Sequence, residues 1–87
     1  MNFIKINGVN YNKLHVSWFT DPQPALRTYH NGMYESWRYD IDGGRSFGSR
    51  YNVEVVVVKL KIKSEDETVL FFDNIELAKE VIDQLIQ

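Results

Sequence analysis

Residues 40–51 read DIDGGRSFGSRY and combine the glycines, acids and arginines from which phosphate loops and metal loops are built. Gly43 and Gly48 have the G-x-x-x-x-G spacing of a P-loop. The next two positions hold Ser49 and Arg50, where that motif requires a lysine and then a serine or threonine. A P-loop also opens a helix whose N-terminus faces the phosphate, whereas a valine-rich segment follows here. We therefore predict no nucleotide site in this loop.

The same loop begins like a calcium site. Asp40 and Asp42 precede Gly43, but an EF-hand needs a third oxygen ligand two residues later and a glutamate at position twelve, where this chain has Gly44 and Tyr51. The two aspartates could also be imagined as the carboxylate pair of a glycoside hydrolase, although nothing in the pattern indicates a cleft. Turn chemistry explains Asp-Gly better, because the aspartate bonds its own backbone and glycine accepts positive φ.

Other catalytic and metal chemistry has little support. The chain has no cysteine, and its two histidines, His15 and His30, do not have zinc-ligand spacing. No serine lies in a nucleophile-elbow context such as G-x-S-x-G. We predict no catalytic residues, no metal site and no cofactor, and we therefore expect a protein that is not an enzyme.

Arginines and aromatic rings are concentrated between residues 27 and 51. This segment holds four arginines and six Tyr, Trp or Phe rings, together with His30. Arginine and aromatic residues dominate binding hot spots, because they combine a large contact area with a polar tip. The alternative is that many of these rings fill the core of a small sheet. We predict a surface that binds a protein partner, with these site residues: Arg27, Tyr34, Arg38, Arg45, Phe47 and Arg50.

Single-stranded nucleic acid is the alternative partner for that surface. Bases stack on exposed rings and guanidinium groups meet phosphates in many such proteins. The charge pattern argues against it, because Glu35, Asp40 and Asp42 lie among the arginines and the chain has a formal net charge of −2. Residues 1–52 carry six Lys/Arg and four Asp/Glu, whereas residues 53–87 carry four and eight. No strongly basic stripe is present.

Length and composition place limits on the fold. A chain of 87 residues fits a single domain, 1–87, and buries only ~60 to 65 percent of the surface that its unfolded form exposes. Its composition, with 44 percent hydrophobic and 25 percent charged residues, is that of a globular protein. No segment has the apolar length of a signal peptide or a membrane span. We expect a soluble, cytoplasmic protein.

The last segment has the pattern of an amphipathic helix. Asp73 is the predicted N-cap, with Glu76 completing a capping box and Phe72 and Leu77 placed as a hydrophobic staple. The apolar positions recur at spacings of three and four, and they are Ile75, Ala78, Val81, Ile82, Leu85 and Ile86. We predict a helix from Asp73 to Ile86 with one buried face.

Residues before the helix read as strands. The predicted strands are Phe3–Asn7, Lys13–Thr20, Leu26–His30, Met33–Ile41, Asn52–Lys63 and Thr68–Phe72. Asn31-Gly32 predicts a type I′ hairpin turn, and Pro22 and Pro24 are expected to end the strand Lys13–Thr20, because neither proline can donate to a ladder. In Lys13–Thr20 the alternation places Leu14, Val16 and Trp18 on one inner side.

The valine-rich strand contains a conflict. Val58, Leu60 and Ile62 alternate with three lysines, which indicates one buried face and one wet face. Val55 and Val57 lie on the lysine side, so that face must be covered there or a bulge must switch it. The expected fold is α+β, a curved antiparallel sheet or small barrel of about six strands with one C-terminal amphipathic helix.

The two ends of the chain resemble small uncharacterised proteins of phages and bacteria. The start, Phe3 to Asn7 with Tyr11 and Asn12, has their F-I-K-I-N opening, and Leu70 to Ala78 has their strand-to-helix ending. The resemblance implies a mobile-element origin, and small acidic phage proteins of this appearance often bind and redirect a host machine. It also leaves open a structural phage component that self-associates through an exposed strand edge.

Overall fold

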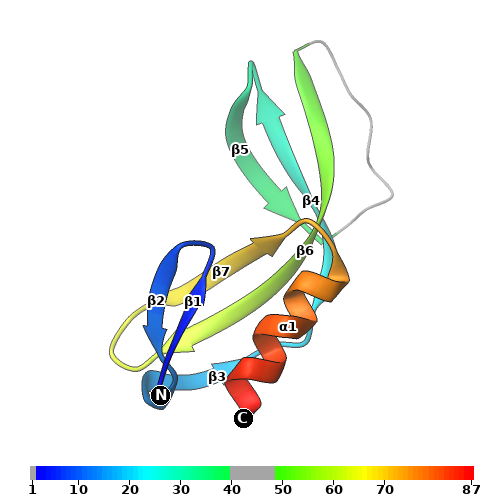
Figure 1. The fold of residues 1–87 in the computed structure, drawn as a ribbon. Coiled ribbons are helices and arrows are strands. Elements are labelled where there is room, and N and C mark those ends of the chain that lie inside the picture. The colour runs from blue at the N-terminus through cyan, green and yellow to red at the C-terminus, as the bar shows by residue number, and fades with distance from the viewer. Residues whose placement is uncertain (1, 40–48) are drawn as a thin grey trace.

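The computed structural model describes residues 2–39 and 49–87, and these form an α+β fold (Figure 1). The strands are β1 (Phe3–Ile6), β2 (Val9–Asn12), β3 (Val16–Phe19), β4 (Gln23–His30), β5 (Met33–Arg38), β6 (Arg50–Ile62) and β7 (Glu67–Phe72). A 3-10 turn, η1 (Lys13–His15), precedes β3, and the helix α1 (Ile75–Ile86) follows β7. The predicted class, a curved antiparallel sheet with a C-terminal helix, is confirmed. The described residues contain seven strands where about six were expected, because β2 forms a hairpin with β1.

The long strand β6 organises the main sheet. β4 pairs with its residues 50–57, β7 with residues 56–61, and β3 with residues 60–62, all antiparallel. Since β7 overlaps along β6 with both β3 and β4, those two strands must share the opposite edge of β6. β5 pairs with β4 on the far side. The hairpin β4–β5 and the first half of β6 therefore extend as an arm from the part that holds β1, β2 and α1 (Figure 1).

One face of β6 carries the main hydrophobic core. Val58 and Leu60 are fully buried there, as the alternation predicted. Ala78 and Val81 of α1 pack into the same cluster, together with Ile6 of β1. We call this side of the sheet the helix face. Burying a side chain of this size contributes roughly 1.5 to 3 kcal/mol, so this cluster is the main source of stability.

The other face of β6 carries a second, smaller core. Val57 and Ala25 are fully buried, and Val55 is 8% exposed. Trp37 of β5 and Phe71 of β7 pack against them. The conflict in the valine run is thus resolved by coverage of the second face, and the rings that cover it come from both sides of β6.

The N-cap of the helix differs from the predicted one. Asn74, not Asp73, has the extended backbone of an N-cap, and its side-chain oxygen accepts a hydrogen bond from the Leu77 N–H at 3.0 Å. The predicted N-cap is therefore wrong by one residue, and the predicted capping box with Glu76 is wrong as well, because the third residue after Asn74 is Leu77. Asp73 precedes the first turn and Glu76 lies in it, where negative charge is favourable in either case. Asp and Asn are also similarly good N-caps, so the sequence pattern alone does not decide between Asp73 and Asn74.

The strand predicted for Lys13–Thr20 is also partly wrong. Asn12 caps η1 by accepting a hydrogen bond from the Leu14 N–H, and the chain turns there instead of extending. β3 then carries a register shift between Val16 and Trp18. As a result Leu14 is 72% exposed and Trp18 is 42% exposed, whereas Val16 lies against the main core.

Two turn signals have different outcomes. Asn31 and Gly32 both have positive φ, 53° and 79°, which confirms the hairpin turn between β4 and β5. The strand before the prolines ends as predicted, because β3 stops at Phe19, but the next strand starts earlier than the predicted Leu26, since β4 begins at Gln23 and includes Pro24. β5 pairs with β4 only from Leu26 onward. The edge of β4 at Pro24 that faces away from β6 is therefore not paired with β5, and the lack of an N–H on Pro24 breaks no hydrogen bond there. Within the described residues, no helix has the length and apolar character needed to cross a membrane.

Candidate functional site: an aromatic face

Six aromatic rings form a continuous row on the side of the sheet opposite α1. They come from β4, β6, β7, β5 and the residue that follows β5, and they are Tyr29, Tyr51, Phe71, Tyr34, Trp37 and Tyr39. We call these six rings, with Arg27 and Lys59, the aromatic face. The strand registers explain their common side, since directly opposed residues in antiparallel strands point the same way.

Ring-to-ring contacts join the row from one end to the other. Tyr51 stacks on Tyr29 with centroids 5.3 Å apart, and Tyr29 meets Tyr34 edge-on at 6.2 Å. Phe71 then contacts both Tyr34 and Trp37, at 6.1 and 6.0 Å. Edge-to-face and offset pairs at these separations are each worth about 0.5 to 1.5 kcal/mol beyond the area they bury. The row is therefore held in place by its own contacts.

The contact between β5 and β7 reveals the curvature of the sheet. Two strands, β4 and β6, separate them, and neighbouring strands lie ~4.8 Å apart. Phe71 nevertheless reaches both rings of β5, which requires the sheet to curl toward this side. The aromatic face is thus concave, and its floor is the second core around Val57 and Ala25.

Arg27 lies in the middle of the row. Its guanidinium carbon is 4.2 Å from the ring centre of Phe71, 4.7 Å from that of Tyr34 and 5.3 Å from that of Tyr29. The Nε atom is buried, and no hydrogen-bond acceptor within the described residues reaches it. Aromatic rings attract the cation through their quadrupole but do not accept its N–H groups as a carboxylate would.

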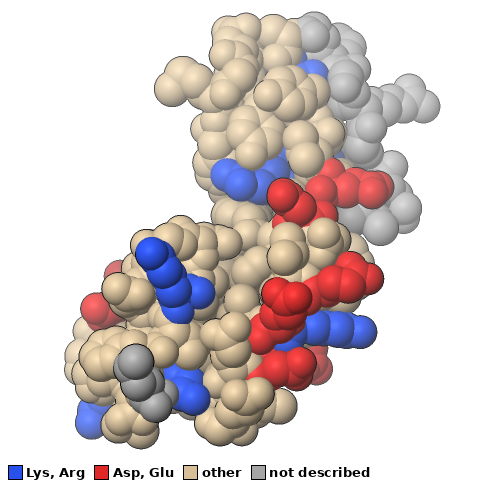
Figure 2. Space-filling view, viewed as in Figure 1, with Lys and Arg blue, Asp and Glu red and all other residues tan. Residues whose placement is uncertain are grey.

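A second cation stands at the other end of the row. The Lys59 ammonium lies 5.5 Å from the ring centre of Tyr39 and 5.8 Å from that of Trp37. Both charged side chains that the described residues place over these rings are therefore positive. The acidic side chains gather elsewhere, and Figure 2 shows many of them over α1. The aromatic face therefore carries two positive charges in a chain whose formal net charge is −2.

The structure brings some of the predicted site residues together and separates others. Arg27 and Tyr34 meet on the aromatic face. Arg38 is paired with Leu26 and Arg50 with His30, and these register positions lie on the opposite side of the sheet. Arg50 also forms a two-pronged ion pair with Glu35, at 3.0 and 3.2 Å. Its guanidinium is therefore already occupied.

The remaining predicted residues, Arg45 and Phe47, lie outside the described residues, as do Asp40 and Asp42. Of the aromatic face, only Arg27 and Tyr34 were among the predicted site residues. Four further rings lie within the predicted segment 27–51 but were not named as site residues, and Phe71 and Lys59 lie outside it. Phe71 alternates with the buried Leu70 and Phe72, so its side of β7 was readable from the sequence. Its contact with β5 was not, because that contact depends on the curl of the sheet.

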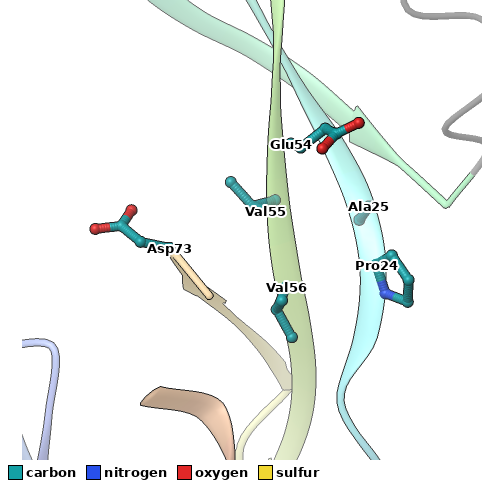
Figure 3. Close-up of a pocket in the computed structure, with 6 residues that line it drawn as sticks. All are labelled: Pro24, Ala25, Glu54, Val55, Val56 and Asp73. Carbon is teal, nitrogen blue, oxygen red and sulfur yellow. The ribbon is translucent and has the colours of Figure 1, made fainter. Parts of the chain in front are cut away.

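A shallow hollow lies between β4, β6 and the end of β7 (Figure 3). Ala25, Val55 and Val56 line it with Pro24, and two acids, Glu54 and Asp73, stand at its rim. In Figure 3 the two carboxylates point away from each other. They are therefore not placed to share a proton or to clasp one cation. In the described part of the chain, no group of three or more His, Asp or Glu residues is arranged to hold a metal ion.

Comparison of the chain with models of protein families, with curated proteins and with solved structures found no match in any of the three.

Proposed function

We propose that the protein is a binding protein without catalytic activity and that it recognises a protein partner through the aromatic face. The observation that carries the proposal is the exposure of rings that are also fixed in place. Tyr34 and Tyr39 are each 45% exposed and Tyr51 is 41% exposed, although all three contact neighbouring rings. A ring needed only for the core has no reason to stay this accessible.

Preorganised aromatic residues suit binding for an energetic reason. Ordering a flexible side chain on binding costs roughly 0.5 to 1.5 kcal/mol, and that cost lowers affinity. Tyr34 is already held between Tyr29, Phe71 and the Arg27 guanidinium. It brings a large apolar area and a hydroxyl group to a partner at little further entropy cost.

Single-stranded nucleic acid is the second candidate. The two cations over a row of rings favour it, because phosphates would bind the cations and bases would stack on the rings. The number of cations that residues 2–39 and 49–87 place over the rings favours protein instead. Arg50 is paired with Glu35, and a phosphate-led site normally neutralises several phosphates at once. Retention on single-stranded DNA and RNA columns at rising salt separates the two candidates, since phosphate-led retention falls steeply.

The test of partner recognition uses neighbouring residues that point to opposite faces. Tyr34 belongs to the aromatic face, whereas Met33 pairs with His30 and points to the other side while being 74% exposed. Tagged chains carrying Tyr34→Ala or Met33→Ala are incubated with host lysate beside the unmodified chain. We expect partners to be retained by Met33→Ala and lost by Tyr34→Ala, with both variants showing the same circular dichroism spectrum. Equal capture by the two variants would count against the aromatic face.

The resemblance at the chain ends supports a particular source for the lysate. Small phage proteins with such ends would meet their partners in a bacterial host. We propose a component of a host machine as the partner, and bacterial lysates are therefore the first to use.

A further inference from the structure

β5 forms one outer edge of the main sheet beside the aromatic face. Within the described ranges, 2–39 and 49–87, it pairs with β4 alone. Five of its six residues are exposed, and Trp37 is half-buried. An edge strand presents unpaired backbone N–H and C=O groups, which are a template for a further strand. Two of its side chains, those of Tyr34 and Trp37, belong to the aromatic face.

Arg27, on β4, lies one strand inward from that edge. Its Nε atom is buried without an acceptor among the described residues, and its guanidinium stands over rings that accept no strong hydrogen bond. A carboxylate that arrived from outside would form charge-assisted hydrogen bonds with the N–H groups of this guanidinium. Lys59 adds a second positive charge at the other end of the row.

We propose that the outer edge of β5 takes up an extended, acidic segment of the partner, whose carboxylates reach Arg27 across Tyr34. This inference rests on the proposed function, because it names the kind of partner that the aromatic face receives. A strand added to β5 would lie about 10 Å from β4, twice the spacing between neighbouring strands. A glutamate side chain and the Arg27 side chain approach each other from the two sides of that gap.

Charge decides between this occupant and a second copy of the chain. Pairing of β5 with β5 of another molecule would place two cationic faces side by side, and like charges facing each other are destabilising. The register shift in β5, beside Glu35, also strengthens the local twist, which disfavours flat pairing of two identical edges. An acidic segment instead meets Arg27 and Lys59 with the complementary sign.

Three synthetic peptides test the chemistry of the partner. Each has ten residues, alternating threonine with glutamate, glutamine or lysine, and binding is measured by titration calorimetry at low ionic strength. We expect the glutamate peptide to bind at least about tenfold more tightly than the glutamine peptide, and the lysine peptide to bind most weakly. Arg27→Gln should abolish the preference for glutamate. Arg50→Gln, which removes an ion-paired arginine on the other face, should preserve it.

Hydrogen exchange tests the place of binding. Addition of the glutamate peptide should slow exchange of backbone amides in β5 and leave those of β7, which among the described strands pairs with β6 alone, unchanged. Equal affinity for the three peptides, no binding by any of them, unchanged exchange in β5, or concentration-dependent dimerisation through β5 would each overturn the inference. The proposed function is judged separately, by the comparison of Tyr34→Ala with Met33→Ala, so either idea can fail without the other.

Discussion

Arg27 is the residue at which stability and binding can be separated. Two opposing contributions meet in its side chain. The guanidinium gains from three ring contacts at 4.2 to 5.3 Å, and it loses from a buried Nε that has no acceptor within the described residues. Replacement by methionine removes both contributions but keeps an unbranched apolar stem of similar length over the second core.

The expected change follows from the size of each contribution. A desolvated cation–π contact is worth up to about 2 kcal/mol, and three rings that share one cation do not triple that figure. A buried, unsatisfied donor costs about 1 to 3 kcal/mol. Methionine recovers about 0.3 to 1.5 kcal/mol from contacts between sulfur and the rings. Arg27→Met should therefore change the free energy of unfolding by less than about 1 kcal/mol, while it weakens binding of the glutamate peptide about tenfold or more.

The assay is urea denaturation followed by circular dichroism, run beside the peptide titration. Arg27→Ala serves as the control, because it also removes the apolar stem and should destabilise the fold by about 2 kcal/mol. A loss of more than about 2 kcal/mol in Arg27→Met would refute the reasoning. The guanidinium would then be a structural element of the second core, and its availability to a partner would have no support.

The remaining predictions concern the fold and use the same denaturation assay. Asn74→Ala should lower stability by about 1 kcal/mol and Asp73→Ala by clearly less, because Asn74 caps α1; the reverse order would restore the cap predicted from sequence. Gly32→Ala should cost about 1 kcal/mol, since its φ is 79°, and an unchanged midpoint would show that the turn adjusts freely. Leu60→Ala should cost about 2 to 5 kcal/mol, and Leu77→Ala, at a site 42% exposed, should cost less than half as much.

Local patterns predicted the parts of the fold that local chemistry determines. The Asn31-Gly32 turn needs positive φ at both positions, and few residue pairs accept this. The two residues alone were therefore enough to predict the hairpin turn. α1 followed from its apolar stripe, of which Ala78 and Val81 are buried. Strand ends and caps were less secure, because Asp73 and Asn74 are equally good capping residues and tertiary packing chooses between them.

The errors came from features that periodicity does not record. Apolar and polar residues do alternate in Lys13–Thr20. However, the Asn12 side chain accepts a hydrogen bond from the Leu14 N–H and starts a turn, and the strand then shifts register before Trp18. A shift by one residue sends every later side chain to the other face. The exposed Leu14 and Trp18 are the direct result.

The sequence showed which residue types are concentrated in the candidate site, but not which of them lie on the same side of the sheet. The concentration of rings and arginines in residues 27–51 indicated recognition, but strand pairing decides which of them share a side. Arg38 follows Trp37 directly and so points to the opposite face. Phe71, more than thirty positions along the chain, completes the row because the sheet curls. Contacts of this kind depend on the fold as a whole.

The two faces of β6 place a constraint on how its function can be changed. On the helix face, α1 covers the main core together with β1 and β2, and Val58 and Leu60 are fully buried, so we expect substitutions there to act through stability. On the other face, the cover is made of rings that are themselves part of the candidate site. If the aromatic face binds a partner as proposed, Trp37 and Phe71 serve both roles, and their loss would weaken folding and binding together. Tyr34 is exposed at the edge beside Arg27. A substitution of Tyr34 should therefore change binding with the least effect on the core.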